Sequence, residues 1–204
     1  MPSRNTIKTD VPHSYYHVYA RGASKQRIFL DAKDFEYFKS LFARYLTRNN
    51  LSNINGEPYP YHGESLELLC FCFMPNHFHL LIYQHTEGAM SKLMRSLMTS
   101  YSMYFNKKYR RTGSLFESRY KASRIERQEY LEHITRYIHL NPRYWQHYKH
   151  SSIAYYSGQQ APVWIKPGRI LEIFPSVAEY VSFVSDYEEN KHMFDIIKAE
   201  LADS

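Results

Sequence analysis

The sequence predicts an α+β fold, in which an antiparallel sheet carries helices on one face and a helical extension follows at the C-terminal end. Three observations predict it. First, strand-like apolar runs alternate with amphipathic stretches of helical spacing. Second, two of those runs are separated only by Pro75 and Asn76. Third, the chain has 204 residues. Runs joined by so short a turn must pair as an antiparallel hairpin. The length suits one domain of about 150 residues with an extension.

Four segments are expected to form strands. Residues 14–21 are aromatic and β-branched, and as a strand their side chains alternate between two faces. Residues 66–74 and 77–83 form the hairpin. Both are apolar at nearly every position, which indicates a central place in the sheet. A short fourth strand is expected over residues 120–125.

Three helices are expected between and after these strands. The first follows Asp31, a good N-cap with Asp34 three residues on, and it ends near Arg48. The second covers residues 89–109 and the third covers residues 127–141, where apolar residues recur at helical spacing. The order β-α-β-β-α-β-α is typical of the ferredoxin-like, split βαβ arrangement with one added helix. Helices on one face would leave the other face of the sheet free for a ligand.

The chain is expected to divide into a domain and an extension. Residues 14–158 contain every expected strand and form the domain. Residues 159–204 form the C-terminal extension, which begins as a loop. A weakly amphipathic pattern over residues 177–201 predicts a final helix there.

The composition favours an acidic partner and excludes a membrane span. Lys and Arg exceed Asp and Glu by 26 to 20, which favours nucleic acid without establishing it. No apolar run reaches the roughly 18 residues of a membrane helix, and the N-terminus lacks a signal-peptide pattern. The only cysteines, Cys70 and Cys72, point the same way on one strand and are interpreted as small core residues in a reducing cytosol.

Two histidines in the hairpin are the first candidate ligands. His77 and His79 flank Phe78, so on a strand they share one face and make half of a metal site. The alternative is a pair of half-buried strand histidines without a ligand. A zinc site that adds Cys70 and Cys72 is conceivable, although the spacing matches no common zinc pattern.

The third helix carries the second half of the candidate site. Tyr130, Tyr137 and Asn141 fall on one stripe of this helix, and Tyr137 and Asn141 are four residues apart. An asparagine carbonyl oxygen can complete the coordination of a hard divalent cation. The alternative is a core-facing Tyr137 and an Asn141 that only caps the helix.

Cationic side chains gather just before that helix. They are expected to contact phosphates, so that affinity for nucleic acid falls with salt, although any one of them is otherwise a solvated surface charge. The candidates are Lys107, Lys108, Arg110, Arg111, Arg119, Lys121 and Arg124. Arg21, at the end of the first expected strand, is a further candidate that could join them. Phe116 and Tyr120 are candidates for stacking on bases.

Four sequence blocks resemble single-tyrosine HUH transposases, and more specifically the REP-associated tyrosine transposases and their relatives. HUH denotes two histidines that flank an apolar residue. In the order of that family, the blocks are HVYARGASKQRIF (17–29), FMPNHFHLLI (73–82), NKKYRRTGSLFESRYKAS (106–123) and EYLEHITRYIHLNP (129–142). Together they span most of residues 14–158.

The resemblance implies a ferredoxin-like fold with the histidine strand at its centre, and it implies roles for residues. His77 and His79 would hold Mg²⁺ or Mn²⁺. Asn141 stands where relatives often have a glutamine as third ligand. Tyr137 matches the nucleophile, with Tyr130 as the alternative.

The resemblance also implies an activity. The chain would be a metal-dependent endonuclease and strand transferase that acts on single-stranded or hairpin DNA through a 5′-phosphotyrosine intermediate. It would be a cytoplasmic, nucleoid-associated protein of bacterial type, and a monomer or a homodimer with the tyrosine helix acting in trans. The competing hypotheses are a non-catalytic, single-stranded nucleic-acid-binding module on an RRM-like sheet, and a metal-dependent hydrolase without covalent chemistry.

Overall fold

The structure is a computed structural model that describes residues 10–48 and 51–186. Its centre is an antiparallel sheet with the strand order β2-β3-β1-β4. The strands are β1 (Ser14–Arg21), β2 (Leu66–Met74), β3 (His77–Gln84) and β4 (Lys121–Ile125). This order, with a helix between β1 and β2 and another between β3 and β4, confirms the ferredoxin-like fold. Each strand lies within one residue of its predicted bounds.

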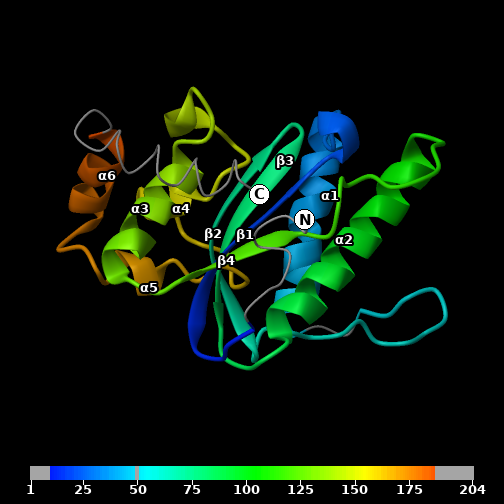
Figure 1. Ribbon diagram of the computed structural model, residues 1–204, viewed down its shortest axis with the longest axis horizontal. Coiled ribbons are helices and arrows are strands. Elements are labelled where there is room, and N and C mark those ends of the chain that lie inside the picture. The colour runs from blue at the N-terminus through cyan, green and yellow to red at the C-terminus, as the bar shows by residue number, and fades with distance from the viewer. Residues whose placement is uncertain (1–9, 49–50, 187–204) are drawn as a thin grey trace, which may run out of the picture.

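Two long helices cover one face of the sheet (Figure 1). They are α1 (Ala32–Leu46) and α2 (Ala89–Lys108). The carboxylate of Asp31 accepts a hydrogen bond from the Asp34 amide and completes a capping box, as the sequence predicted for the start of α1. Phe38 and Phe78 belong to the first hydrophobic core, which lies between these helices and the sheet.

Helices also cover the opposite face, and here the structure differs from the prediction of helices on one face (Figure 1). They are α3 (Gln128–His139), α4 (Ile153–Tyr156), α5 (Gly168–Leu171) and α6 (Val177–Ser185). Cys70 and Leu81 pack with Ile138 of α3 in a second hydrophobic core. Neither face of the sheet is therefore left without helices. Helical periodicity shows that α3 has an apolar side but not which face of the sheet receives it.

The apolar character of β2 has a different cause from the predicted central position. β3 is central, but β2 is at the edge of the sheet. The segment after α3 covers that edge: the amides of Ser152 and Lys166 donate to the carbonyl oxygens of Phe71 and Leu68, at 3.0 and 2.8 Å. A covered edge strand is as buried as a central one.

The remaining elements are short. Two 3₁₀ helices, η1 (Ala23–Lys25) and η2 (Trp145–His147), follow β1 and α3. The predicted final helix begins at Val177 as expected, and its part beyond residue 186 lies outside the described residues. Among the described helices, none is long and apolar enough to cross a membrane.

Candidate active site

The strand register sets the positions of the two histidines. Phe78 points into the first core, so His77 and His79 point to the face that α3 covers. Arg21 of β1 is paired with His77, and Tyr19 is paired with His79. Lys121 of β4 is paired in turn with Tyr19. The sheet thereby places histidines and cationic side chains side by side on one face.

Helix α3 brings Tyr137 and Asn141 to the histidines. The ring centroids of His79 and Tyr137 are 5.3 Å apart. The Nε2 atom of His77 lies 3.1 Å from the Oδ1 atom of Asn141, just beyond the end of α3. All four residues from the two predicted halves of the site therefore meet within one chain. Tyr130, the alternative nucleophile, packs against the second core and does not line the pocket at the histidines.

A pocket of about 180 Å³ opens at this place. His77, His79 and Tyr137 line it. Three of the predicted cations line it as well, namely Arg21, Arg119 and Lys121. The sequence interpretation missed Tyr19, Lys25, Glu117 and Ser118, which also line the pocket.

The donor set fits a divalent cation. Burial lowers the pKa of His77, so its ring is neutral at pH 7 and carries one proton. Its Nδ1 atom lies 2.7 Å from the Oδ1 atom of Asn76, and a ring proton on Nδ1 donates to that oxygen. The lone pair of Nε2 then faces the Oδ1 atom of Asn141, a second acceptor. Neighbouring ligands of an octahedral ion with bonds of about 2.1 Å are about 3.0 Å apart, so the two acceptors have the spacing of ligands that share a cation.

His17 is a functional candidate that the sequence interpretation missed. Its Nε2 atom lies 3.0 Å from the Nδ1 atom of His79, and both residues are buried. Burial lowers the pKa of His17 to about 3, so the ring is neutral. When His17 accepts the proton of His79 Nδ1, the lone pair of His79 is on Nε2, as ligation requires. The alternation of residues 14–21 placed His17 on a common face with Tyr19, but the pairing of that strand with the histidine strand was not visible.

The environment of Tyr137 keeps its phenol protonated at neutral pH. Burial raises the pKa of this phenol to about 12, while a hydrogen bond with Asn141 and the charge of Arg21 act in the opposite direction. The site therefore combines a buried phenol with the cationic groups that can stabilise its ionised form.

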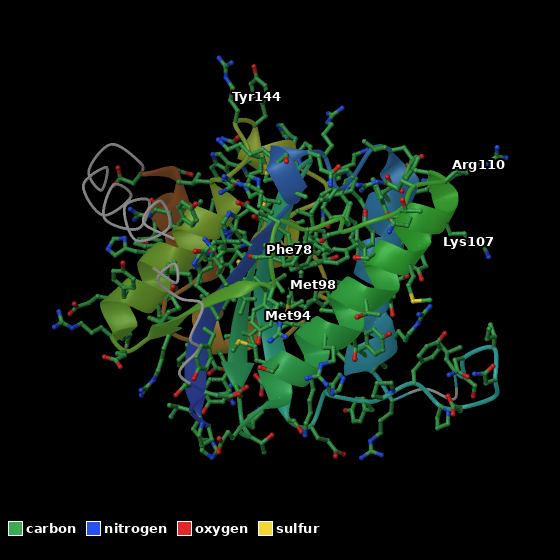
Figure 2. The ribbon with its side chains drawn as sticks, turned by 45° about the vertical axis from the view of Figure 1, so that its right-hand side comes forward. Phe78, Met94, Met98, Lys107, Arg110 and Tyr144 are labelled. Atoms are coloured by element: carbon green, nitrogen blue, oxygen red, sulfur yellow. The ribbon has the colours of Figure 1, made fainter. Side chains whose placement is uncertain are left out.

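The other predicted DNA contacts lie elsewhere. Lys107 and Arg110 lie at the C-terminal end of α2, where their side chains extend outward (Figure 2). Arg111 lies in the same stretch, with its guanidinium over the ring of Phe105. Arg124 points to the opposite face from Lys121 and pairs with Glu126.

Lys108 requires a correction. Its Nζ atom lies 2.8 Å from Asp31 and 2.7 Å from the fully buried Asp34. Two carboxylates therefore already neutralise its charge, and its role is to join α2 to the start of α1 rather than to bind a phosphate.

The zinc hypothesis is also not supported. Cys70 lies beside His139, with its Sγ atom 3.2 Å from Nε2. Within residues 10–48 and 51–186, no three histidine, cysteine or acidic side chains are placed to hold one metal ion. The candidate ligand set of His77, His79 and Asn141 differs because its third member is an amide.

Comparisons with known proteins agree with the fold. A solved structure described as the REP-associated tyrosine transposase bound to a REP hairpin superposes with a TM-score of 0.54 at 11% identity, covering 76% of this chain and 87% of that chain. A candidate transposase from Deinococcus radiodurans R1 gives a TM-score of 0.40 at 15% identity, over 68% of this chain and 95% of that one. No curated protein sequence matches the chain.

The family comparison is more specific. The model of the IS200-like transposases matches residues 10–141, which include all four strands, both histidines, Tyr137 and Asn141. The match covers more than half of the 204 residues. The chain therefore belongs to the IS200-like transposase family.

Proposed function

We propose that this transposase is a metal-dependent endonuclease and strand transferase that acts on single-stranded DNA containing a hairpin, through a 5′-phosphotyrosine intermediate. One observation carries the proposal. His77, His79 and Tyr137 come from elements about 60 residues apart in the sequence, yet they line one small pocket with cationic walls, and Asn141 contacts His77 beside it.

Each side chain has a role in the proposed reaction. Arg21, Arg119 and Lys121 bind the phosphates on either side of the scissile bond. The phenol oxygen of Tyr137 attacks the phosphorus, and the bond from phosphorus to the 3′-oxygen breaks. The phenol proton ends on the departing 3′-oxygen, so the products are a 5′-phosphotyrosine and a 3′-hydroxyl. The reverse attack by a 3′-hydroxyl rejoins strands without an external energy source.

His77, His79 and Asn141 would hold Mg²⁺ or Mn²⁺ in this proposal. A bound divalent cation offsets the charge that develops on the phosphate during transfer. The cationic side chains of the pocket act in the same sense, and Arg21 also opposes the rise in the pKa of Tyr137 that burial causes.

The geometry favours action in cis. Tyr137 lies beside His79 of its own chain, so the proposed site needs no residue from a second copy. Hairpin DNA is the proposed substrate because the REP-associated structure with the same fold is described as bound to a REP hairpin.

The competing hypothesis of a binding module on an RRM-like sheet is less well supported than the transferase proposal. RRM-like binding needs an exposed sheet face on which bases can stack. In this structure helices cover both faces.

The proposal is tested by trapping the covalent intermediate. The protein is incubated with Mn²⁺ and labelled, single-stranded hairpin DNA, and a protein–DNA adduct is sought after denaturation. We expect an adduct with the wild type and with Tyr130→Phe, and none with Tyr137→Phe. An adduct formed by Tyr137→Phe would show that the nucleophile is another residue, and equal cleavage of double-stranded DNA would argue against the proposed substrate.

A further inference from the structure

Arg136 is a buried cation whose donors are not all satisfied. It lies on α3 directly before Tyr137, and only 1% of its surface is exposed. Its guanidinium carbon lies 3.6 Å from the centre of the Phe183 ring on α6, which packs beside α3 (Figure 1). The Nε and Nη1 atoms are both buried, and within residues 10–48 and 51–186 neither has a hydrogen-bond partner. Because a guanidinium stays charged, two donors of a buried cation lack an acceptor there.

His133 presents a further donor at the same place. It lies three residues before Arg136 on α3, and the centroid of its ring is 5.7 Å from that of Phe183. Burial and the charge of Arg136 lower the pKa of His133, so the ring is neutral at pH 7 and carries one N–H. Its Nδ1 atom is buried and also lacks a partner among the described residues. The side of α3 that faces α6 therefore holds three unsatisfied nitrogen atoms around one aromatic ring.

The described acidic side chains do not satisfy this site. Glu132 and Asp186 are near enough for their charges to oppose the lowering of the Arg136 pKa by burial, but in the described part of the chain neither forms an ion pair with it. Arginine is almost never fully buried unless it is paired, because an uncompensated charge in the interior is strongly destabilising. The site therefore requires an anionic acceptor from another source.

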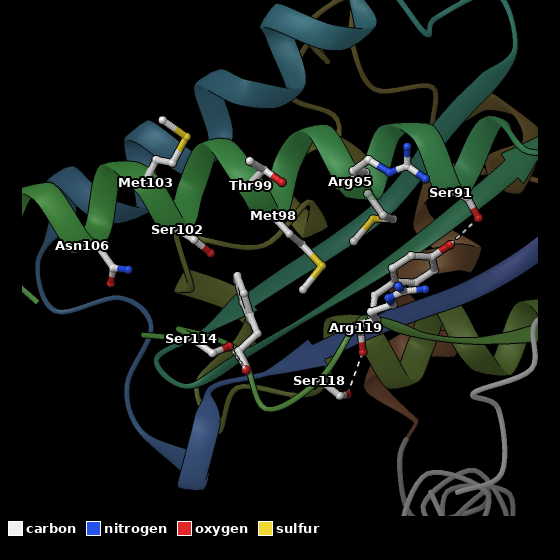
Figure 3. A pocket seen from close by; sticks show the side chains of 13 residues that line it. Ser91, Arg95, Met98, Thr99, Ser102, Met103, Asn106, Ser114, Ser118 and Arg119 are labelled. Carbon is white, nitrogen blue, oxygen red and sulfur yellow. Dashed lines mark hydrogen bonds between the residues drawn. The ribbon is translucent and has the colours of Figure 1, made fainter. Parts of the chain in front are cut away.

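The arginines of a wider groove differ from Arg136 in their exposure. This groove, of about 770 Å³, lies between α2 and the segment before β4 (Figure 3). Arg95 and Arg119 line it, and both are exposed, so water can solvate their charges. Phe116 and Tyr120 of the same lining are 4% and 6% exposed, too buried to stack on bases as the sequence predicted. The requirement for one particular anion is thus specific to Arg136.

The chain itself supplies carboxylates next to this site. Asp186 directly follows α6, three residues after Phe183, and it is the last described residue. Glu188 and Glu189 come next but one and next but two in the sequence. An extended chain spans at most about 3.6 Å per residue, so the backbone of Glu188 is within roughly 7 Å of that of Asp186. A carboxylate is also the group to which a guanidinium donates two parallel hydrogen bonds.

From this unsatisfied site and this short connection, we infer that Arg136 and His133 bind a carboxylate, and that the carboxylate belongs to Glu188 or Glu189. Arg136 donates through Nε and Nη1, and His133 donates through Nδ1. The contact joins the segment after α6 to α3 at the residue next to Tyr137. It involves no DNA, so the inference goes beyond the proposed function and does not depend on it.

The test is a double-mutant cycle in the full-length protein. Glu188→Gln combined with Glu189→Gln removes the proposed ligands, and Arg136→Met removes the guanidinium but keeps an unbranched apolar side chain. The matched control combines Glu200→Gln with Asp203→Asn, which removes the same charge further along the same segment. Urea unfolding gives the equilibrium constant of unfolding for each protein and for the combination of both changes.

The cycle distinguishes a direct contact from two independent effects. We expect the double glutamine variant to raise the equilibrium constant of unfolding about tenfold when Arg136 is present, and to leave it unchanged in the Arg136→Met background. The control should change neither. An equal rise in both backgrounds, or no rise in either, would overturn the assignment. An Arg136→Met protein more stable than the wild type would overturn it too, because removal of a paired cation is not stabilising here.

A second measurement does not require Arg136→Met to fold. In ¹⁵N-labelled protein, the Nε proton of Arg136 should exchange with water about tenfold faster in the double glutamine variant than in the wild type or the control. Unchanged exchange would argue that neither glutamate is the acceptor.

Added acetate identifies the source of the carboxylate. At constant ionic strength, acetate should stabilise the double glutamine variant, whose site is open, and not the wild type, whose site is occupied. If acetate stabilises the wild type to the same extent, the site takes a free anion and the assignment to Glu188 or Glu189 is wrong.

Discussion

His17 and His79 contact each other through one nitrogen of each ring, with Nε2 of His17 3.0 Å from Nδ1 of His79. The rings are nearly parallel, at an interplanar angle of 18°, and both are buried. Burial lowers the pKa of both rings, so a single proton joins two neutral imidazoles. Its position decides which nitrogen of His79 carries the lone pair that faces the pocket.

His17 is therefore expected to act as a positioning residue for the metal site. His17→Gln removes the ring that accepts the proton of His79, and we expect Mn²⁺ affinity to fall by about 10- to 100-fold. Titration calorimetry with Mn²⁺ measures this without any DNA. His147→Gln, at an exposed position, is the control and should bind Mn²⁺ as the wild type does. Unchanged affinity in a folded His17→Gln protein would show that His17 only fills the core.

Asn141 is expected to be the third ligand. Asn141→Ala removes the amide oxygen that lies 3.1 Å from His77, so Mn²⁺ affinity should fall by at least about tenfold. Asn141→Gln keeps an amide, so it should retain most of the affinity. The comparison of the two variants by calorimetry separates loss of a ligand from loss of packing. If the Asn141→Ala and Asn141→Gln proteins bind Mn²⁺ equally well, the amide is not a ligand.

The features that were predictable from the sequence are local. The cap at Asp31 depends on residues three positions apart, and the hairpin around Pro75 and Asn76 depends on a turn and two apolar runs. The shared face of His77 and His79 follows from strand alternation alone.

The features that were not predictable depend on pairing between distant segments. His17 reaches His79 only because β1 pairs with β3 in one particular register, which no pattern within either strand specifies. Lys108 directly follows Lys107 in the sequence, but only Lys108 is paired with Asp34 of α1. The side of the sheet that α3 covers is likewise determined by packing between distant segments, and it decides whether Tyr137 lies next to the histidines.

Substitutions of Lys108 and Lys121 are expected to affect different properties, namely stability for Lys108 and DNA binding for Lys121. Lys108→Gln leaves the buried Asp34 carboxylate without its cation. We expect a loss of about 2 kcal/mol in the free energy of unfolding, because Lys108 is partly exposed and Asp34 keeps other donors. Lys121→Gln should cost little stability but weaken DNA binding and its salt dependence. Urea unfolding and fluorescence anisotropy measure the two effects. A Lys108→Gln protein with native stability and reduced DNA affinity would restore Lys108 as a phosphate contact.

The final prediction concerns the support of the nucleophile helix by the segment that follows it. The Nδ1 atom of His139 lies 2.6 Å from the hydroxyl oxygen of Tyr180 on α6, and both side chains are fully buried. His139 lies on α3 two residues from Tyr137. A buried hydrogen bond therefore joins α6 to the helix that carries the proposed nucleophile. Tyr180→Phe leaves a buried ring nitrogen without this partner, and we expect a loss of about 1–3 kcal/mol in the free energy of unfolding.

Two further proteins make this prediction specific. Tyr144→Phe alters an exposed tyrosine, with 72% of its surface accessible, and should unfold at the wild-type urea concentration. A chain that ends at residue 158 loses Ile170, Tyr180 and Val184 from the second core, so it should be less stable than Tyr180→Phe. If the shortened chain instead unfolds at the same urea concentration as the full chain, residues 159–204 do not stabilise α3, and Tyr137 is held by the preceding domain alone.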